Sequence, residues 1–157
     1  MKKPIGFTLI EMVIVISIIA ILSVMSAIPI LRGYTAYNTS KTTMIADAQA
    51  RYALERMARE LRNLASKTAI TTASAATITF VDSSGATVTY SLSGSQLLRN
   101  SDVLADNISS ITFTYLDSTG SVTAVLANIR FITISLNVSI SNATFTTSTA
   151  IYTRIPL

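Results

Sequence analysis

A run of twenty residues without a charge, from Met12 to Leu31, constrains this chain more than any other feature of its sequence. As a helix that rises about 1.5 Å per residue, the run would be about 30 Å long, which is the thickness of the hydrocarbon core of a bilayer. The apolar core of a secretory signal peptide is usually shorter, roughly 7–15 residues. The run therefore predicts a membrane-spanning helix near the start of the chain.

Two details distinguish this segment from an ordinary anchor. Glu11 lies just inside the apolar region, although a carboxylate at the centre of a membrane helix costs roughly 2.5–3.5 kcal/mol. A short basic leader, residues 1–6, ends at Gly6, and the missing side chain of glycine suits a protease that grips the backbone. Cleavage after Gly6 would free the amine of Phe7. On a helix this amine and the Glu11 carboxylate would share one face, so they could pair within one chain or between neighbours.

An ordinary signal anchor or signal peptide is the alternative for residues 1–31. The helix N-terminus would then stabilise Glu11, whose side chain would reach the lipid headgroups. The two lysines of the leader are matched by Arg32 and Lys41 beyond the run, so the positive-inside rule alone does not orient the segment.

The rest of the chain has the size and composition of one small folded domain. Roughly 125 residues remain outside the membrane segment, and the low content of charged residues, 13%, argues against a disordered tail. The formal charge of +4 falls to +2 without the two leader lysines, which is a weak argument for nucleic-acid binding. The chain has no cysteine and no histidine, which excludes disulfides, histidine-based nucleophile systems and imidazole metal ligands.

A long amphipathic helix is expected to follow the apolar run. Pro29 and Gly33 bracket its exit, where we expect a bend but not an end. Residues 32–67 should continue the helix as one rod, because Tyr34 to Lys67 contains neither proline nor glycine and its small and apolar residues recur every three or four positions. This stripe, which should lie on a sheet, consists of Ala46, Ala50, Leu54, Met57, Leu61 and Leu64.

The opposite face of this helix carries opposite charges four positions apart. The expected ion pairs are Arg51 with Glu55, Glu55 with Arg59, and Arg56 with Glu60. Such pairs contribute only about 0.2–0.5 kcal/mol each, so this face is either simply solvated or a docking surface for neighbouring subunits.

Beyond Ala65 the sequence alternates with a period of two and predicts strands. We expect a Thr/Ala/Ser-rich connector over residues 67–76, a hairpin around the turn at 82–85, and a polar loop over 100–107. Residues 68–157 should thus form an antiparallel β-sheet of about five or six strands, and with the helix an α+β fold. The predicted strands are Thr77–Val81, Ala86–Leu92, Gln96–Arg99 as an edge strand, Ile108–Leu116, Ile129–Ile140 and Ala143–Ile155.

The acidic residues of the domain supply little chemistry. Asp102 and Asp106 share the polar loop and could bind calcium through their oxygens, but no further acidic ligand lies nearby in the sequence. Turn and capping roles explain these two residues together with Asp82 and Asp117. We find no phosphate-binding loop, metal-ligand cluster or nucleophile elbow, so no catalytic residue, cofactor or metal is predicted.

Tyrosines spaced along the helix beside arginines offer one further hypothesis. They could stack on nucleic-acid bases or on a partner, although tyrosines just outside a membrane span are commonly interface anchors. The tyrosines are Tyr34, Tyr37 and Tyr52.

The N-terminal sequence K-K-P-I-G/F-T-L-I-E, residues 2–11, resembles the prepilin cleavage and methylation motif of type IV pilins and type II secretion pseudopilins. Two further blocks resemble the minor pilins of the W type and the J-type minor pseudopilins. They are A-L-E-R-M-A-R-E-L-R-N-L at 53–64, and I-T-F-T-Y-L-D-S-T-G at 111–120 followed by I-R-F-I-T-I-S-L-N-V at 129–138. The cysteine pair of some relatives is missing, and the domain is short.

This resemblance implies a pilin-like fold and a structural role without catalysis. A prepilin peptidase would cut between Gly6 and Phe7 and methylate the Phe7 amine. The subunit would remain in the inner membrane as a single-pass protein, with residues 1–6 cytoplasmic, residues 7–31 in lipid and the domain in the periplasm.

The same resemblance implies a route to assembly. An inner-membrane platform would extract the subunit from lipid into a helical filament, a pilus or pseudopilus, together with other pilins. There Glu11 would meet the Phe7 amine of a neighbour. Minor subunits of this kind resemble initiation or tip components. The alternatives are a major pilin, a tip binding module such as an adhesin or DNA-uptake receptor, and an unrelated anchored domain or enzyme.

Overall fold

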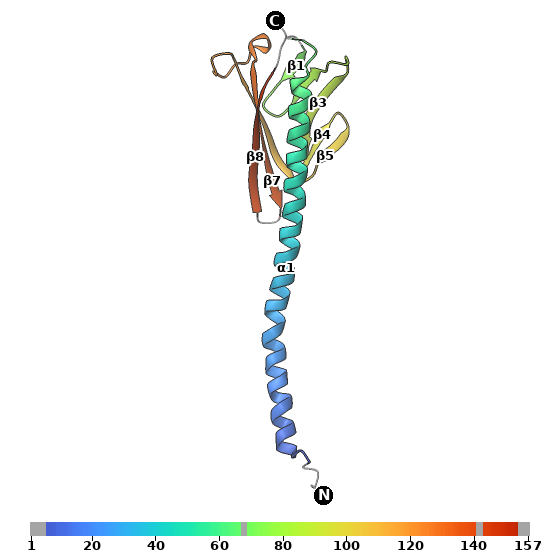
Figure 1. Ribbon diagram of the computed structural model, residues 1–157, viewed down its shortest axis with the longest axis vertical. Coiled ribbons are helices and arrows are strands. Elements are labelled where there is room, and N and C mark those ends of the chain that lie inside the picture. Colours follow the sequence, from blue (N-terminus) through green and yellow to red (C-terminus); the bar gives the residue numbers. More distant parts are fainter. Residues whose placement is uncertain (1–5, 67–68, 141–142, 154–157) are drawn as a thin grey trace. The chain divides into compact units, whose positions relative to one another are not determined.

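The computed structural model describes residues 6–66, 69–140 and 143–153, and the chain divides into two compact units, Met1–Lys41 and Thr42–Leu157. One helix, α1 (Leu9–Arg62), runs through both units (Figure 1). It passes Pro29 and Gly33 without interruption, so the expected continuation is confirmed, while the bend stays a prediction. The expected boundary of the membrane segment, between residues 31 and 32, also stays a prediction.

In the first unit every described side chain is exposed, and α1 contains one stretch long and apolar enough to cross a membrane. The hydroxyls in this stretch are satisfied within the helix. Ser17, Ser23 and Ser26 each donate to the carbonyl oxygen four residues earlier, at 2.7, 2.7 and 2.8 Å. A helix in hydrocarbon needs such internal partners, because no water is available there.

In the second unit α1 buries the predicted apolar stripe. All six of its residues are buried: five lie on α1, with Ala53 and Ala58 beside them, and the sixth, Leu64, lies just beyond the end of the helix. The helix ends at Arg62, however, five residues before the predicted end at Lys67, which lies outside the described residues. The reason is competition from β-structure. Ala65 donates its N–H to the Val81 carbonyl, and Leu64 is buried through a β-bridge to Asp82.

A five-stranded antiparallel sheet follows, in the order β1-β2-β3-β4-β5. The hairpin expected around residues 82–85 is confirmed, since β2 pairs with β3 from Ile78↔Tyr90 to Val81↔Thr87. Gly85 has a φ of 85° in its turn, a conformation that glycine adopts without strain. The strands are β1 (Ile70–Ala73), β2 (Ile78–Val81), β3 (Thr87–Ser93), β4 (Gln96–Arg99) and β5 (Asp102–Ala105).

Two of these strands correct the sequence-based expectation. β1 lies within the predicted connector 67–76, and β5 lies within the predicted polar loop 100–107, so β4 is an inner strand and not an edge. The tight turn from β4 to β5 depends on Asn100, which has a φ of 56°. Its N–H donates to the Thr89 carbonyl at 2.7 Å, and its Oδ1 accepts the Thr89 N–H at 2.8 Å. Asparagine tolerates the left-handed region and forms such local bonds, which explains a turn without glycine.

A second, three-stranded antiparallel sheet has the order β6-β7-β8, so the described residues form two sheets with eight strands and not one sheet of five or six. The predicted alternation is confirmed: every second residue of β7 from Ile132 to Ile140 is buried. β8 ends at Tyr152, and the predicted end at Ile155 lies outside the described residues. The elements are β6 (Ile108–Leu116), the short 3₁₀-helix η1 (Leu126–Asn128), β7 (Phe131–Ile140) and β8 (Ala143–Tyr152).

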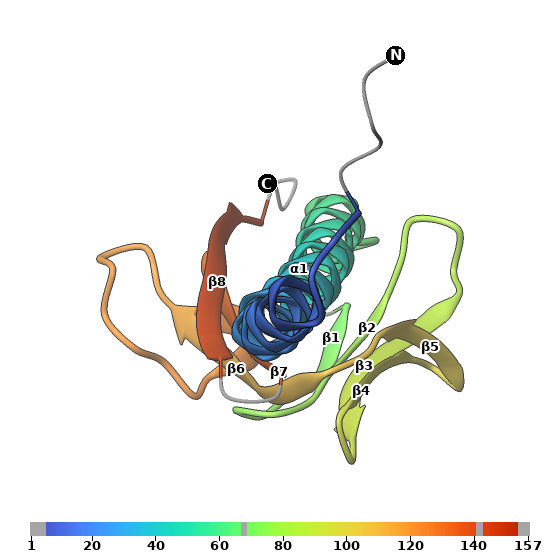
Figure 2. The same ribbon diagram turned by 90° about the horizontal axis from the view of Figure 1, so that it is seen from below.

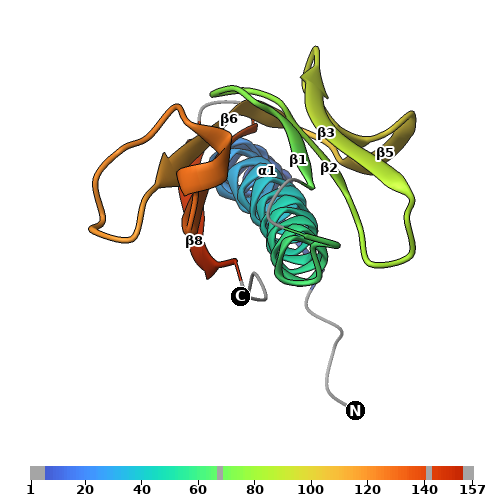
Figure 3. The same ribbon diagram turned by 90° about the horizontal axis from the view of Figure 1, so that it is seen from above.

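The two sheets curve around the part of α1 that belongs to the second unit. Seen along the helix, the five-stranded sheet lies on one flank and β8 on the other (Figures 2 and 3). The alanines and leucines of α1 meet the apolar faces of both sheets in one buried cluster. Small residues on the helix allow this close approach. One long helix packed on antiparallel sheets confirms the predicted α+β class.

Candidate functional site

The N-terminus of α1 is capped by the residues of the predicted cleavage motif. Thr8 Oγ1 accepts the Glu11 N–H at 3.3 Å, and the Thr8 carbonyl accepts the Met12 N–H at 3.2 Å. The helix begins at Leu9, two residues after the predicted start of the membrane helix at residue 7. Thr8 and Glu11 have the spacing of a capping box, a sequence signal that the prediction did not use. The Gly6–Phe7 bond therefore lies outside the helix, two residues before its first turn.

Gly6 has no steric reason to be glycine in the folded chain. A Cβ at this position would meet no atom within 4 Å, and Phe7 beside it is 76% exposed. A glycine that its own fold does not require is consistent with recognition of this segment by another protein. Cleavage after Gly6 stays a prediction.

Phe7 and Glu11 do not share a helical face in the uncleaved chain, because α1 begins at Leu9. Both residues are exposed. Pairing of the Phe7 amine with Glu11, within a chain or between neighbours, stays a prediction that applies to the cleaved protein.

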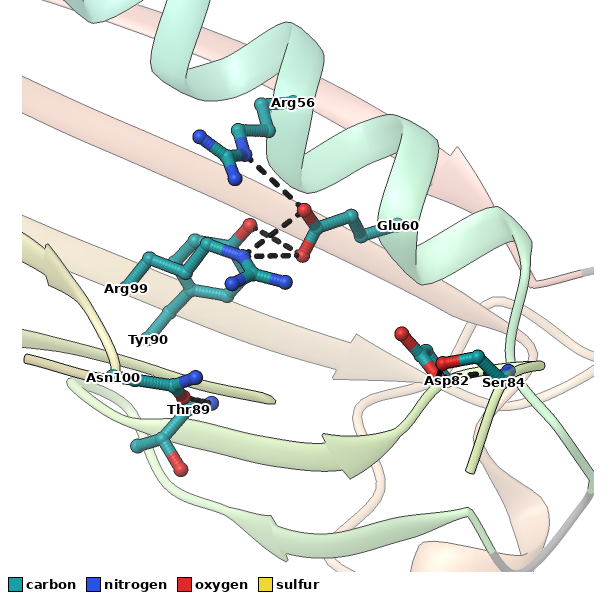
Figure 4. A network of polar contacts seen from close by, with 8 residues as sticks. All are labelled: Arg56, Glu60, Asp82, Ser84, Thr89, Tyr90, Arg99 and Asn100. Carbon is teal, nitrogen blue, oxygen red and sulfur yellow. Dashed lines mark hydrogen bonds and ion pairs between the residues drawn. The ribbon is translucent and has the colours of Figure 1, made fainter. Parts of the chain in front are cut away.

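A polar cluster in the domain, centred on Glu60, joins α1 to the five-stranded sheet (Figure 4). Arg99 Nε on β4 donates to both Glu60 oxygens at 3.1 Å, and Arg56 Nε donates to Oε1 at 3.2 Å. The Tyr90 hydroxyl on β3 donates to Oε2 at 2.8 Å. The predicted Arg56–Glu60 pair is thus confirmed. The two partners of Glu60 on the sheet were not predicted, because they lie 30 and 39 residues away in the sequence and no local pattern indicates such distant contacts.

The surroundings shift the pKa of the two acidic groups in this cluster in opposite directions. Burial by itself would raise the pKa of Glu60, but the hydrogen bonds from Tyr90, Arg99 and Arg56 outweigh it and hold that pKa below its usual value. Burial, and then the bond to the Glu60 carboxylate, raise the pKa of the Tyr90 hydroxyl. The cluster is therefore charged at neutral pH and acts as a structural clamp.

The charged face of α1 differs from the prediction at Arg51. Arg51 Nε donates to Asp47 at 2.8 Å, which raises the pKa of Arg51, and neither predicted pair with Glu55 forms between described residues. This face lines two hollows, of about 450 Å³ and 400 Å³. The larger hollow lies between α1 and β8 and is lined by Arg51, Leu54, Glu55, Ala58, Arg59, Arg62 and the segment Thr147 to Thr149.

The aspartates have mainly local roles. Asp82 Oδ1 accepts the N–H groups of Ser84 and Ala86 in the β2–β3 turn, and Asp117 does the same in the turn after β6. Hydrogen bonds from the hydroxyl two residues on, and then from the backbone, lower the pKa of both carboxyls. Asp106 accepts the Gln96 amide at 2.8 Å. Within the described ranges no group of three or more acidic residues could hold a metal ion.

The helix tyrosines remain open to solvent in the structure. Tyr34, Tyr37 and Tyr52 are each more than half exposed. Stacking on a partner and anchoring at a membrane surface both stay predictions.

These features together define a class of architecture: in the part of the chain that the structure describes, one long helix has an apolar stretch able to cross a bilayer, and its later part packs in a two-sheet α+β domain. Residues 1–27 match the prokaryotic N-terminal methylation motif. The match and the fold support a type IV pilin-like protein, a processed structural subunit that is a substrate of prepilin peptidase. Among curated proteins, none matches the chain in sequence.

Proposed function

We propose that this chain is a minor pilin or pseudopilin, cut between Gly6 and Phe7, methylated at Phe7 and assembled into a filament. The observation that carries the proposal is the methylation motif at residues 1–27, most of which lies in the first part of the uninterrupted helix α1. In the proposed subunit residues 7–31 lie in lipid and then in the filament core, residues 32–62 continue the helix, and the β domain lies in the periplasm until assembly.

The exposed apolar surface of α1 supports the proposed transfer of this helix from lipid to the filament core. No side chain of its most apolar stretch is buried in the structure. Lipid covers such a helix in the membrane, and the helices of neighbouring pilins would replace lipid in a filament.

Glu11 would pair with the Phe7 amine of a neighbouring subunit during filament assembly. A carboxylate alone in hydrocarbon is unfavourable, as is an N-terminal amine, and pairing the two between neighbouring subunits neutralises both charges. Normal assembly therefore depends on the cleavage that creates the Phe7 amine.

The assignment to a minor subunit rests on the two resembling blocks in the domain. Residues 53–64 cover the last turns of α1 and the two residues after it, and 111–120 with 129–138 include most of β6 and β7. These blocks form part of the buried core of the domain. They therefore support the resemblance of the domain to minor pilins more directly than they support a position at the filament tip or a role in initiation. Cellular abundance separates the proposed minor subunit from a major pilin, which would be present in many more copies.

The decisive experiment is the intact mass and N-terminal sequence of the full chain, extracted from membranes of cells with and without a prepilin peptidase. The expected product begins at N-methylated Phe7 only when the peptidase is present. An intact Met1 in both samples, or a cut beyond Leu31, would overturn the proposal and return residues 1–31 to an ordinary anchor or signal peptide.

A further inference from the structure

The outer edge of β8 lacks the features that usually protect an edge strand. β8 pairs with β7 over ten successive residues, from Ile140↔Ala143 to Phe131↔Tyr152, without a bulge. It contains no charged residue and no proline, and no strand pairs with its other side among the described residues. Short length, lysine, proline and bulges are the usual means by which proteins prevent further pairing. An edge this long and regular is suited to receive another strand.

The surface beside this edge has more basic than acidic groups, because Arg51, Arg59 and Arg62 line it together with one carboxylate, that of Glu55. The hollow between β8 and α1 has a volume of about 450 Å³, and its apolar floor includes Leu54 and Ala58. Arg59 and Arg62 stand on its helix side, and neither forms an ion pair with a described residue. An extended segment laid along β8 would therefore pass beside two unpaired cations, which favour carboxylates.

The opposite flank of the same domain carries an acidic edge strand. β5 is the last strand of the five-stranded sheet, with Asp102 at its first position and Asp106 directly after its last. Val103 between them is 52% exposed. Figure 2 shows β5 and β8 on opposite sides of α1.

We propose that the β8 edge receives β5 of a second copy of this chain, so that the three-stranded sheet of one copy continues into the five-stranded sheet of the next. Asp102 and Asp106 of the second copy lie opposite Arg59 and Arg62 of the first. Five residues of strand span about 13 Å, whereas Arg59 and Arg62 lie only about 4.5 Å apart along the helix axis, so the long arginine side chains diverge to reach the two carboxylates.

This contact has consequences for assembly. It is heterologous, because it joins two different surfaces, so each copy retains a free β5 or β8 edge for a further subunit. The contact uses only the domain and does not depend on cleavage after Gly6. It therefore goes beyond the proposed function, and its failure is distinguishable from a failure of processing.

Disulfide cross-linking of the full chain in membranes tests the contact, because the natural sequence has no cysteine. One tagged chain carries Ser148→Cys on β8, and a chain with a second tag carries Val103→Cys on β5. The proposal does not fix which residue of β8 lies opposite Val103 of the second copy. Thr146→Cys and Ala150→Cys, on the same face of β8 as Ser148, are therefore tested in parallel. A disulfide forms only when the two Cα atoms come within about 7 Å. The expected product is a dimer that contains both tags.

A matched control uses Val122→Cys, which is 76% exposed but lies in the loop between β6 and β7. It should not cross-link to β8 above background. Equal cross-linking of Val122→Cys and Val103→Cys would mean random collision and would overturn the proposal. So would the absence of any mixed dimer, or dimers formed only between two copies of Ser148→Cys, which would indicate a symmetric β8–β8 contact.

A charge exchange tests the ionic part of the contact. Arg59→Asp with Arg62→Asp in the β8 chain should lower the yield of mixed dimer about fivefold to tenfold. Asp102→Arg with Asp106→Arg in the β5 chain should restore it. Circular dichroism of each variant verifies folding. If folded variants cross-link as well as the parent pair, the arginines and aspartates do not meet, and the proposed orientation is wrong.

Discussion

Replacing Glu60 by glutamine tests whether the clamp between α1 and the five-stranded sheet stabilises the domain. Glutamine has almost the same size but no charge, and its amide nitrogen cannot accept the bonds now given by Arg99, Arg56 and Tyr90. Hydrogen bonds to charged groups contribute roughly 1.5–3 kcal/mol each. Because the Glu60 side chain is 20% exposed, water replaces part of what is lost, and we expect a net loss of about 2 kcal/mol.

The assay is thermal unfolding of the full chain in detergent, followed by the circular dichroism of the domain. For a domain of this size about 2 kcal/mol corresponds to a midpoint lower by about 8 °C. Glu55→Gln is the matched control, since Glu55 lies on the same helix, is exposed and pairs with no described residue. A loss for Glu60→Gln no larger than for Glu55→Gln would refute the idea that the cluster stabilises the fold.

The same pair of proteins has a defined pH dependence. The pKa of Glu60 is lowered in the folded state, so its contribution is fully present above the unfolded value of about 4.3. It is lost as the pH falls through the lower folded value, where the carboxylate becomes protonated. The difference in stability between the parent and Glu60→Gln should therefore shrink on acidification from pH 7, and a difference that grew instead would contradict the assigned charge state.

Three further predictions concern the motif and one turn. Gly6→Val should block leader removal, measured by intact mass, whereas Gly33→Ala, which also has open space at its Cβ, should leave it unchanged; a processed Gly6→Val chain would refute the cleavage site. Glu11→Ala should leave leader removal intact but impair assembly, and normal filaments composed of this variant would disprove the proposed pairing with Phe7. Asn100→Ala should lower the free energy of unfolding by about 1–2 kcal/mol, because alanine is strained at positive φ and loses the bond to Thr89, whereas Asn100→Gly should recover the strain part. Equal unfolding midpoints for Asn100→Ala and the parent would show that the turn is not under this constraint.

The sequence by itself determined the elements whose signal is local and long. Twenty uncharged residues predict a membrane helix from composition alone, and the stripe from Ala46 to Leu64 reveals which side of α1 is buried. The alternation in β6 and β7 likewise separates buried from exposed positions, because side chains in a strand point to opposite faces in turn. The cleavage motif is also readable without a structure, since another protein recognises it as a linear segment.

Only the tertiary structure decided how these elements combine. β1 and β5 show no strict alternation of buried and exposed residues, so no period-two signal marks them, and their partners make them strands. The end of α1 at Arg62, the division into two sheets and the bonds of Glu60 to Tyr90 and Arg99 all depend on groups distant in the sequence. Such choices rest on competition for backbone and side-chain hydrogen bonds across the folded domain, and local periodicity contains no information about that competition.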